Sequence, residues 1–285
     1  KLGDLVSQPG FAATFLPRGR APEVGERFEM PPAARALRLI GATRGEAFYR
    51  GEIGAAIAGW SREHGGAMTE ADLAAFRPEW VEPLAQDYRG HTLHEIPPNG
   101  QGIAAQMALG MLAHFDLAAL PVDGPECQHL QIEAMKLAFA DAYRFVADRA
   151  HMEGPAERLL DAGYLASRAK LIDAKRAQHF GPGPAFAGGT IYLATADESG
   201  MMASFIQSNY MGFGSGVVEP TFGISLQNRG AGFSMQERHP NVVAPGKRPF
   251  HTIIPAFLTR DGQPVMSFGV MGGDMQPQGH LQTVV

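Results

Sequence analysis

Hydrophobic residues in the first two thirds of the chain recur three or four positions apart, which is the spacing of one face of an α-helix. Ile103, Met107, Met111 and Phe115, for example, stand four apart and predict a buried apolar stripe. Thr69 precedes an acidic residue by three positions, a spacing that allows a capping-box start for a short helix. The same criteria predict helices over residues 31–39, 44–64, 70–76, 103–115, 126–149 and 164–178.

The pattern changes to that of β-strands at Thr190. A strand is predicted over residues 190–197, followed by a tight turn and a returning strand over residues 201–210. A second hairpin is predicted over residues 251–270, with its turn at residues 261–262. Helices followed by antiparallel hairpins favour an α+β layered domain over alternating βαβ units.

The charge and composition of the chain exclude several classes of function. The 285 residues carry a net charge of -5 and no block of lysine and arginine, which argues against a nucleic-acid or anionic membrane surface. No run of about 18 apolar residues is present, as a membrane span would require. The single cysteine, Cys127, cannot form an internal disulfide, and His91 and His94 lack the helical spacing of a metal site. We assign no metal and expect no cofactor.

The sharpest boundary in the chain is the segment 181–189 (GPGPAFAGG), which directly precedes the strand at Thr190. Taken alone, the segment is a linker and Thr190 is an ordinary strand threonine. The functional alternative is that the Thr190 hydroxyl attacks the preceding carbonyl, so that the chain cuts itself between Gly189 and Thr190. The freed α-amino group would then act as the base for its own hydroxyl. The spacing by itself leaves both interpretations open.

Motifs along nearly the whole chain resemble those of the gamma-glutamyltranspeptidase family. They are, in order, residues 48–53 (FYRGEI), 65–73 (GGAMTEADL), 87–90 (DYRG), 96–102 (IPPNGQG), 138–141 (AFAD) and 213–216 (FGSG). The resemblance implies a four-layer αββα sandwich of the N-terminal nucleophile hydrolase type, incomplete at both ends of this chain. It also implies a precursor that matures into a heterodimer of large and small subunits. Residues 1–189 then belong to the mostly helical large subunit and residues 190–285 to the β-rich small subunit, with Thr190 as nucleophile.

Three further residues take catalytic roles by the same resemblance. The family places a hydroxyl residue on the returning strand beside the nucleophile, and Ser208 stands at that position. Gly272 and Gly273 match a glycine pair whose backbone N–H groups form the oxyanion hole, a role that requires close backbone approach. Without the resemblance, Ser208 is an ordinary strand serine and the glycine pair is a strand-end turn.

The positions that correspond to substrate binding depart from the usual family pattern, which has an asparagine, an acidic loop residue and two adjacent serines. The matching residues here are Tyr210, Gly232, His251 and Thr252, and Arg229 stands where the family has a neutral amide side chain. The glycine removes the natural partner of an α-ammonium group, while Arg229 adds a cation suited to a carboxylate. Tyr210 and His251 either line a pocket for another acyl group or only pack. Asn228 is expected to keep a polar contact.

The sequence therefore predicts an amidohydrolase or acyltransferase that passes a γ-glutamyl or related acyl group to water or an amine. Its partner is a small-molecule amide of the glutathione type. One alternative is an acylase of the same fold that acts on another acyl amide, such as a cephalosporin side chain. Another is a catalytically silent homologue that is not processed. The compartment stays open between bacterial periplasm and cytoplasm, since no N-terminal targeting region is expected in this chain. Asp141 is expected to form a structural salt bridge with an arginine.

Overall fold

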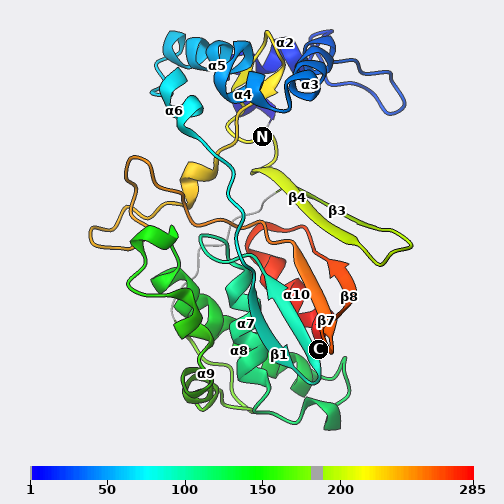
Figure 1. The fold of residues 1–285 in the computed structure, drawn as a ribbon, viewed down its shortest axis with the longest axis vertical. Helices are drawn as coiled ribbons and strands as arrows, with labels where there is room; N and C mark the ends of the chain where they lie inside the picture. Colours follow the sequence, from blue (N-terminus) through cyan, green and yellow to red (C-terminus); the bar gives the residue numbers. More distant parts are fainter. Residues whose placement is uncertain (1, 181–188) are drawn as a thin grey trace. The chain divides into compact units, whose positions relative to one another are not determined.

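The computed structural model describes residues 2–180 and 189–285, which pack into two units (Figure 1). The smaller unit comprises Lys1–Trp80 and Phe213–Asn228, and the larger unit comprises Val81–Gly212 and Arg229–Val285. Each unit has its own hydrophobic core. No helix in the described part of the chain is long and apolar enough to cross a membrane. The predicted division after residue 189 concerns the polypeptide after cleavage, and it stays a prediction.

The smaller unit is mainly helical. Its elements are α1 (Leu2–Val6), α2 (Phe11–Phe15), α3 (Pro31–Thr43), α4 (Glu46–Arg50), α5 (Glu52–Glu63), α6 (Glu70–Ala75), β5 (Val218–Glu219) and β6 (Ile224–Ser225). The single helix predicted over residues 44–64 is wrong, because Gly51 has an extended backbone (φ -135°, ψ -154°) that separates α4 from α5. A Cβ atom added at Gly51 would lie 2.9 Å from the Cα of Ala47, so the break depends on a glycine.

The capping box predicted at Thr69 is confirmed. The N–H of Asp72 donates to the Thr69 hydroxyl (3.2 Å), and the N–H of Thr69 donates to the Asp72 carboxylate (2.8 Å). These two bonds satisfy donors that the first turn of a helix leaves without a partner. Helix α6 accordingly begins at Glu70, where the sequence places it.

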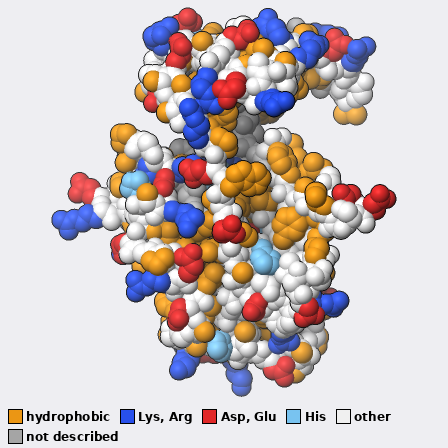
Figure 2. Space-filling model, viewed as in Figure 1, with side chains coloured by type: hydrophobic (Ala, Val, Ile, Leu, Met, Phe, Trp, Pro, Cys, Tyr) orange, Lys and Arg blue, Asp and Glu red, His pale blue; other side chains and the backbone are white. Residues whose placement is uncertain are grey.

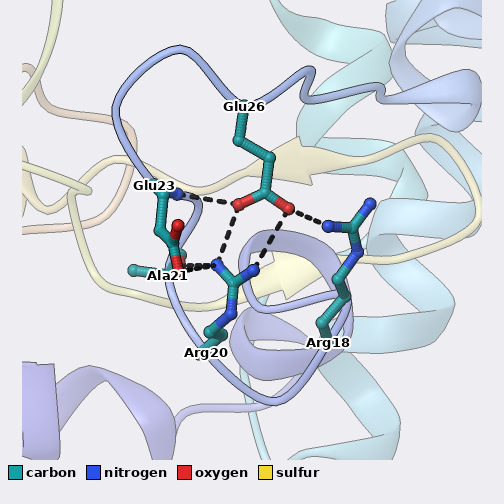
Figure 3. Close-up of polar contacts among 5 residues, drawn as sticks. All are labelled: Arg18, Arg20, Ala21, Glu23 and Glu26. Carbon is teal, nitrogen blue, oxygen red and sulfur yellow. Dashed lines mark hydrogen bonds and ion pairs between the residues drawn. The ribbon is translucent and has the colours of Figure 1, made fainter.

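The loop between α2 and α3 is organised by charges around Glu26 (Figure 3). The Glu26 carboxylate accepts hydrogen bonds from Arg20 (2.8 Å), from Arg18 and from the N–H of Glu23 (2.8 Å). The bond from Arg20 is the largest cause that lowers the pKa of Glu26 to about 2. Because the charges of this exposed loop match one another, they explain its local shape, and we assign them no catalytic role.

The larger unit is built on a four-stranded antiparallel sheet with the strand order β1–β2–β7–β8. The strands are β1 (Leu84–Tyr88), β2 (His91–Glu95), β7 (Ala256–Arg260) and β8 (Gln263–Phe268). Strand β2 pairs with β7, so the sheet joins segments from both sides of the predicted cleavage point. The sequence pattern predicted no element over β1 and β2, which lie between two of the predicted helices.

The hydrophobic pattern does not predict strands β1 and β2, because few of their side chains are buried. Both residues of their turn, Arg89 (φ 49°) and Gly90 (φ 82°), are left-handed, as in a type I′ hairpin. Only the ends of β1 and two positions of β2 are fully buried, which is too sparse for a clear alternation. The turn residues are the one local signal that indicates this hairpin.

One face of the sheet is covered by helices, as Figure 1 shows: α7 (Gly102–Leu112), α8 (Pro125–Phe145) and α10 (Gln276–Val284). The predicted apolar stripe is buried at Ile103, Met107 and Met111, and every other residue of α7 is buried as well. The side-chain amide of Gln106 in this helix donates to the carbonyl oxygens of Leu84 (2.7 Å) and Leu93 (3.1 Å). This polar residue thereby links α7 to both strands of the first hairpin.

Helices α8 and α9 (Ala162–Ala169) both end earlier than predicted. Beyond α8, the Asp148 side chain accepts the N–H of Ala150 (3.2 Å) and caps a new turn. Beyond α9, the Asp173 side chain accepts the N–H of Lys175 (2.9 Å). In both places an aspartate replaces helical hydrogen bonds with local ones. The remaining short helices are of the 3₁₀ type: η1 (Leu117–Ala119), η2 (Arg149–His151), η3 (Ala156–Leu160), η4 (Arg229–Gly232) and η5 (Gly273–Met275).

The salt bridge predicted for Asp141 is confirmed. Two nitrogens of Arg168 each lie 2.9 Å from an oxygen of the Asp141 carboxylate. Burial raises the pKa of Asp141, and hydrogen bonds from Tyr164 and Arg168 act against this rise. The bidentate pair joins α8 to α9, so Asp141 has a structural role.

The hairpin of β3 (Gly189–Ala196) and β4 (Met202–Tyr210) follows the prediction closely. It packs on β8, where the Ser204 hydroxyl donates to the carbonyl oxygen of Phe268 (3.3 Å). The side chains of Ile191, Leu193 and Phe205 are more than half exposed on one face of this hairpin. Figure 2 shows exposed hydrophobic side chains over this part of the larger unit. Helices packed with antiparallel hairpins confirm the predicted α+β class.

The second predicted hairpin is correct at its turn and wrong at its start. Its first strand, β7, begins at Ala256, five residues later than predicted. Pro255 precedes it and has no N–H for a sheet hydrogen bond. Upstream, His251 instead forms an isolated parallel bridge with Gly100. Residues 251–255 therefore run as an irregular segment beside the loop that contains Gly100.

Candidate active site

Thr190 lies at an irregularity in the pairing of β3 with β4. The register shifts by one residue between Gly189 and Ile191, so that Ser208 and Asn209 together face the single residue Thr190. A β-bulge of this kind bends a strand and re-aims the side chains beside it. The predicted nucleophile and the predicted supporting hydroxyl are therefore neighbours across one hairpin. The preceding part of the predicted linker, residues 181–188, lies outside the described residues.

The guanidinium group of Arg229 joins two of the predicted site hydroxyls. One terminal nitrogen donates to the Ser208 hydroxyl, and the other donates to the Thr252 hydroxyl (3.1 Å). Arg229 is only 7% exposed, and burial lowers its pKa to about 10, which leaves it charged at neutral pH. The Ser208 oxygen also accepts the N–H of Tyr210 (3.3 Å). Since both bonds use the oxygen as acceptor, the Ser208 proton is available to a further group.

Tyr210 has a backbone conformation that bulky residues rarely adopt. Its φ of 81° lies in the left-handed region, and strain of this type often marks functional positions. The guanidinium carbon of Arg229 lies 5.5 Å from the centre of the Tyr210 ring, within cation–π range. Burial first, and then the negative charge of Asp274, raise the pKa of Tyr210. The phenol is therefore neutral and held against the arginine.

His251 is fixed by main-chain contacts. Its N–H donates to the carbonyl oxygen of Asn99 (3.0 Å), and its own carbonyl oxygen accepts the N–H of Gln101 (2.9 Å). Burial and the neighbouring Arg229 charge lower the pKa of His251 to about 3. The imidazole is neutral at physiological pH and cannot act there as a cation for a carboxylate.

Gly272 and Gly273 form a turn with φ angles of 146° and 60°, both in the region that favours glycine. A fully buried side chain, that of Gln101, fixes this turn. Its amide nitrogen donates to the carbonyl oxygens of Thr252 (2.7 Å) and Gly273 (2.8 Å). Gln101 thus ties the glycine turn to the segment that carries His251 and Thr252. Gln101 belongs to the motif at residues 96–102, but the sequence did not indicate a role for it.

A pocket of about 490 Å³ adjoins the turn. Its walls include Tyr143, Tyr210, Phe233, Phe250, Thr252 and Asp274. Gly232 also lines it, and a Cβ atom added there would lie 2.6 Å from the carbonyl oxygen of Phe250. The wall consequently has no room for an acidic side chain at position 232. Tyr143 and Asp274 are among the pocket residues that the sequence did not indicate, since only the fold brings α8 and the glycine turn together.

Asn228 is the last residue of the smaller unit and directly precedes Arg229 in the chain. Its proposed polar contact with a substrate stays a prediction. In the ranges 2–180 and 189–285, no group of three or more His, Cys, Asp or Glu side chains could hold a metal ion.

The family of this protein follows from a match along the whole chain. The model of the family described as gamma-glutamyltranspeptidase matches residues 1–285. The chain belongs to the gamma-glutamyltranspeptidase family. Among its relatives in this family, the glutathione hydrolase-like YwrD proenzyme of Bacillus subtilis is 39% identical over 276 residues, which are 96% of this chain and 52% of the relative. The oxamate amidohydrolase proenzyme of Klebsiella pneumoniae is 38% identical, over 98% of this chain and 52% of the relative.

Solved structures agree with the family assignment. The crystal structure of cephalosporin acylase from Bacillus halodurans matches with a TM-score of 0.91 and 50% sequence identity, over 96% of this chain and 50% of that chain. The chain thus spans about half the length of these relatives. The matches confirm the predicted family and the α+β fold of N-terminal nucleophile hydrolases, of which this chain holds a part. The relatives' names also confirm that family members are made as proenzymes.

Proposed function

We propose that this chain is part of a self-cleaving amidohydrolase in which Thr190 is the N-terminal nucleophile. Cleavage between Gly189 and Thr190 assigns residues 1–189 to a large subunit and residues 190–285 to a small one, and the two form a heterodimer. The observation that carries the proposal is the bulge that sets Thr190 against Ser208. It gives the threonine a hydroxyl neighbour at the start of its strand, where a new N-terminus would arise.

In the proposed reaction, the Thr190 hydroxyl oxygen attacks the carbonyl carbon of an amide while its proton passes to the Thr190 α-amino group. The carbon–nitrogen bond then breaks, and the amine leaves with that proton. The acyl group remains as a threonyl ester, which water or a second amine resolves to release a carboxylic acid or a new amide. Ser208 orients the nucleophile, because its oxygen already accepts from Arg229 and Tyr210 and its own proton can be donated.

The proposed oxyanion hole consists of the backbone N–H groups of Gly272 and Gly273. Negative charge develops on the amide oxygen during attack, and fixed N–H donors stabilise it without reorganisation. The bond from Gln101 to the Gly273 carbonyl oxygen supports this role, since it holds the turn at one of its peptide groups. Absence of side chains at both glycines leaves the backbone open to close approach.

The acyl donor is proposed to be a γ-glutamyl amide or a related amide that bears a carboxylate. Arg229 supports a carboxylate-bearing donor because it is buried, charged and fixed by two hydroxyl groups. Tyr210, Asn228, His251 and Thr252 are the remaining proposed donor contacts. An acylase acting on another acyl amide is the second candidate, favoured by the 50% identity to the Bacillus halodurans cephalosporin acylase.

Replacement of the nucleophile tests the proposal. In the complete natural protein, the wild type is expected to give two bands on a denaturing gel, with Thr190 found by mass spectrometry as a new N-terminus. Thr190→Ala is expected to remain a single band and to lose at least about 1,000-fold in amidase activity, because no other group supplies the nucleophile. Thr195→Ala, an exposed change on the same strand, is the control and should be cleaved normally.

The two candidate donors are separated by a substrate screen. Release of p-nitroaniline from γ-glutamyl-p-nitroanilide favours the first candidate, and turnover of other acyl amides alone favours the second. A wild-type protein that stays uncut and inactive would leave the silent homologue as the correct interpretation.

A further inference from the structure

A buried pair of titratable side chains joins the helix that follows the glycine turn to strand β2, and the proposed reaction does not use it. Glu95 is the last residue of β2, and His280 lies in α10. Both side chains are fully buried, and the Nδ1 atom of His280 lies 2.6 Å from Oε1 of Glu95. The pair therefore connects two elements whose contacting residues are 185 positions apart in the chain.

The imidazole is the partner on which the Glu95 carboxyl group depends. Within residues 2–180 and 189–285, Oε2 of Glu95 and Nε2 of His280 are buried without a hydrogen-bond partner. Burial raises the pKa of Glu95, and the charge and hydrogen bond of His280 act against this rise. Apolar side chains of similar volume often stabilise a core as well as such a pair does, so its presence favours a role other than stability.

On the side of β2, the pair is packed against the loop that holds the glycine turn. A Cβ atom added at Gly102 would lie 2.7 Å from Oε2 of Glu95 and 2.8 Å from its Cβ, so this loop lies directly on the carboxyl group. The preceding loop residue is Gln101, whose amide nitrogen donates to the carbonyl oxygen of Gly273 (2.8 Å). Glu95 and Gln101 therefore each contact a residue that lies in the turn or beyond it.

On the side of α10, the helix is packed against the residues that lead into the turn. The centre of the His280 ring lies 5.0 Å from that of Phe268, the last residue of β8. One position earlier in the helix, a Cβ atom added at Gly279 would lie 2.6 Å from a methyl carbon of Val270, which precedes Gly272 by two residues. Because helix and strand end are in such close contact, a shift of α10 would also move the turn between them.

We propose that Glu95 and His280 are positioning residues of the oxyanion hole. Their hydrogen bond holds α10 on β2, and α10 holds the turn so that the N–H groups of Gly272 and Gly273 keep the direction in which they meet the developing charge. The inference rests on the proposed function, which assigns the oxyanion to this turn. Fixed donors act mainly in the transition state, so loss of the pair should lower kcat and change KM little.

Three variants of the complete natural protein test the proposal. Glu95→Leu leaves the imidazole buried without its partner and should lower both stability and kcat. Glu95→Leu combined with His280→Leu removes both polar groups, so stability should recover while kcat stays at least about tenfold below that of the wild type. Glu95→Gln keeps an oxygen that accepts from an Nδ1–H group and should keep kcat within about threefold of the wild type. A merely structural pair would let kcat recover together with stability.

Gln106→Leu is the matched control, because Gln106 is also a fully buried polar residue that joins a helix to β2. This change should lower the free energy of unfolding and leave kcat per folded molecule near that of the wild type. Urea unfolding measures the stability of all variants. The kinetic measurements use γ-glutamyl-p-nitroanilide or another acyl p-nitroanilide that the wild type turns over.

Hydrogen–deuterium exchange measures the order of the turn without a substrate. Peptides that cover residues 268–276 should exchange at least about fivefold faster in the double variant than in the wild type, and at the wild-type rate in Glu95→Gln and Gln106→Leu. Wild-type exchange in the double variant overturns the proposal, and so does a kcat that recovers with stability. An inactive wild type would count against the proposed function, and the exchange rates would still decide whether the pair holds the turn.

Discussion

The core around α7 and the candidate site around Arg229 are both buried, yet they bury different kinds of residues. In the core, every residue of α7 is buried, and the side-chain amide of Gln106 donates to main-chain carbonyl oxygens. The candidate site buries a charged guanidinium, a tyrosine with a left-handed backbone and a glycine turn with positive φ. Such features cost stability and persist where surrounding structure supports them, which is typical of functional positions.

The largest effect on stability is expected from the core. Leu109 is fully buried in α7, so Leu109→Ala should lower the free energy of unfolding by about 2–5 kcal/mol through lost burial and a cavity. Ile132→Ala, at a half-exposed position on α8, is the control and should change it far less. Urea unfolding measures both. Amidase activity per folded molecule should stay near that of the wild type, and a large loss at 20 °C would mean that the core also sets the chemistry.

In the candidate site, by contrast, a substitution should mainly reduce activity. Arg229→Lys keeps the charge but loses the planar fork that reaches both Ser208 and Thr252. We expect a loss of about 100-fold in self-cleavage rate and kcat/KM, because one or both hydroxyls lose a charge-assisted bond. Gel densitometry and donor kinetics provide the readout. Arg260→Lys, exposed at the end of β7, should behave as the wild type; equal behaviour of the two variants would contradict the role of Arg229.

The smallest effect concerns His251 and pH. Its pKa is about 3 in the folded protein, below its ordinary value near 6.5, so the unfolded chain binds more protons between these values. His251 should therefore reduce stability as pH falls from about 6.5 toward 3, with no contribution above that window. His251→Asn is expected to flatten the pH dependence of unfolding relative to the wild type, measured from pH 6.5 to 4.5. His114→Asn, at an exposed position, should leave the dependence unchanged.

Sequence patterns were most informative where the determining contacts are local. The capping box at Thr69 and the β3–β4 hairpin depend on residues within a few positions of each other. The pairing of Asp141 with an arginine also follows from one charged residue on an apolar helix face, although the partner, Arg168, comes from another helix. Burial of a carboxylate demands a partner, whichever element supplies it.

Features that depend on contacts between residues far apart in the sequence could not be predicted from sequence patterns. The periodicity of α7 indicated one apolar face, while packing from several elements buries all of it. The hairpin of β1 and β2 has too few buried side chains to reveal itself, and it forms because β2 pairs with a strand more than 150 residues away. Tyr143, Gln101 and Asp274 carried no mark in the sequence as site residues, because their neighbourhood exists only in the fold.

The pairing of β2 with β7 has a consequence for how a cleaved protein would melt. These strands come from opposite sides of residue 189, as do Gln101 and the glycine turn that it holds. After the proposed cut, unfolding releases two polypeptides, so refolding becomes a second-order reaction. The melting temperature of the mature protein should then rise with protein concentration, whereas that of an uncut precursor should not. Dilution would favour separation of the two polypeptides of the cut protein and so loss of the site, whereas the uncut precursor carries the whole site on one chain.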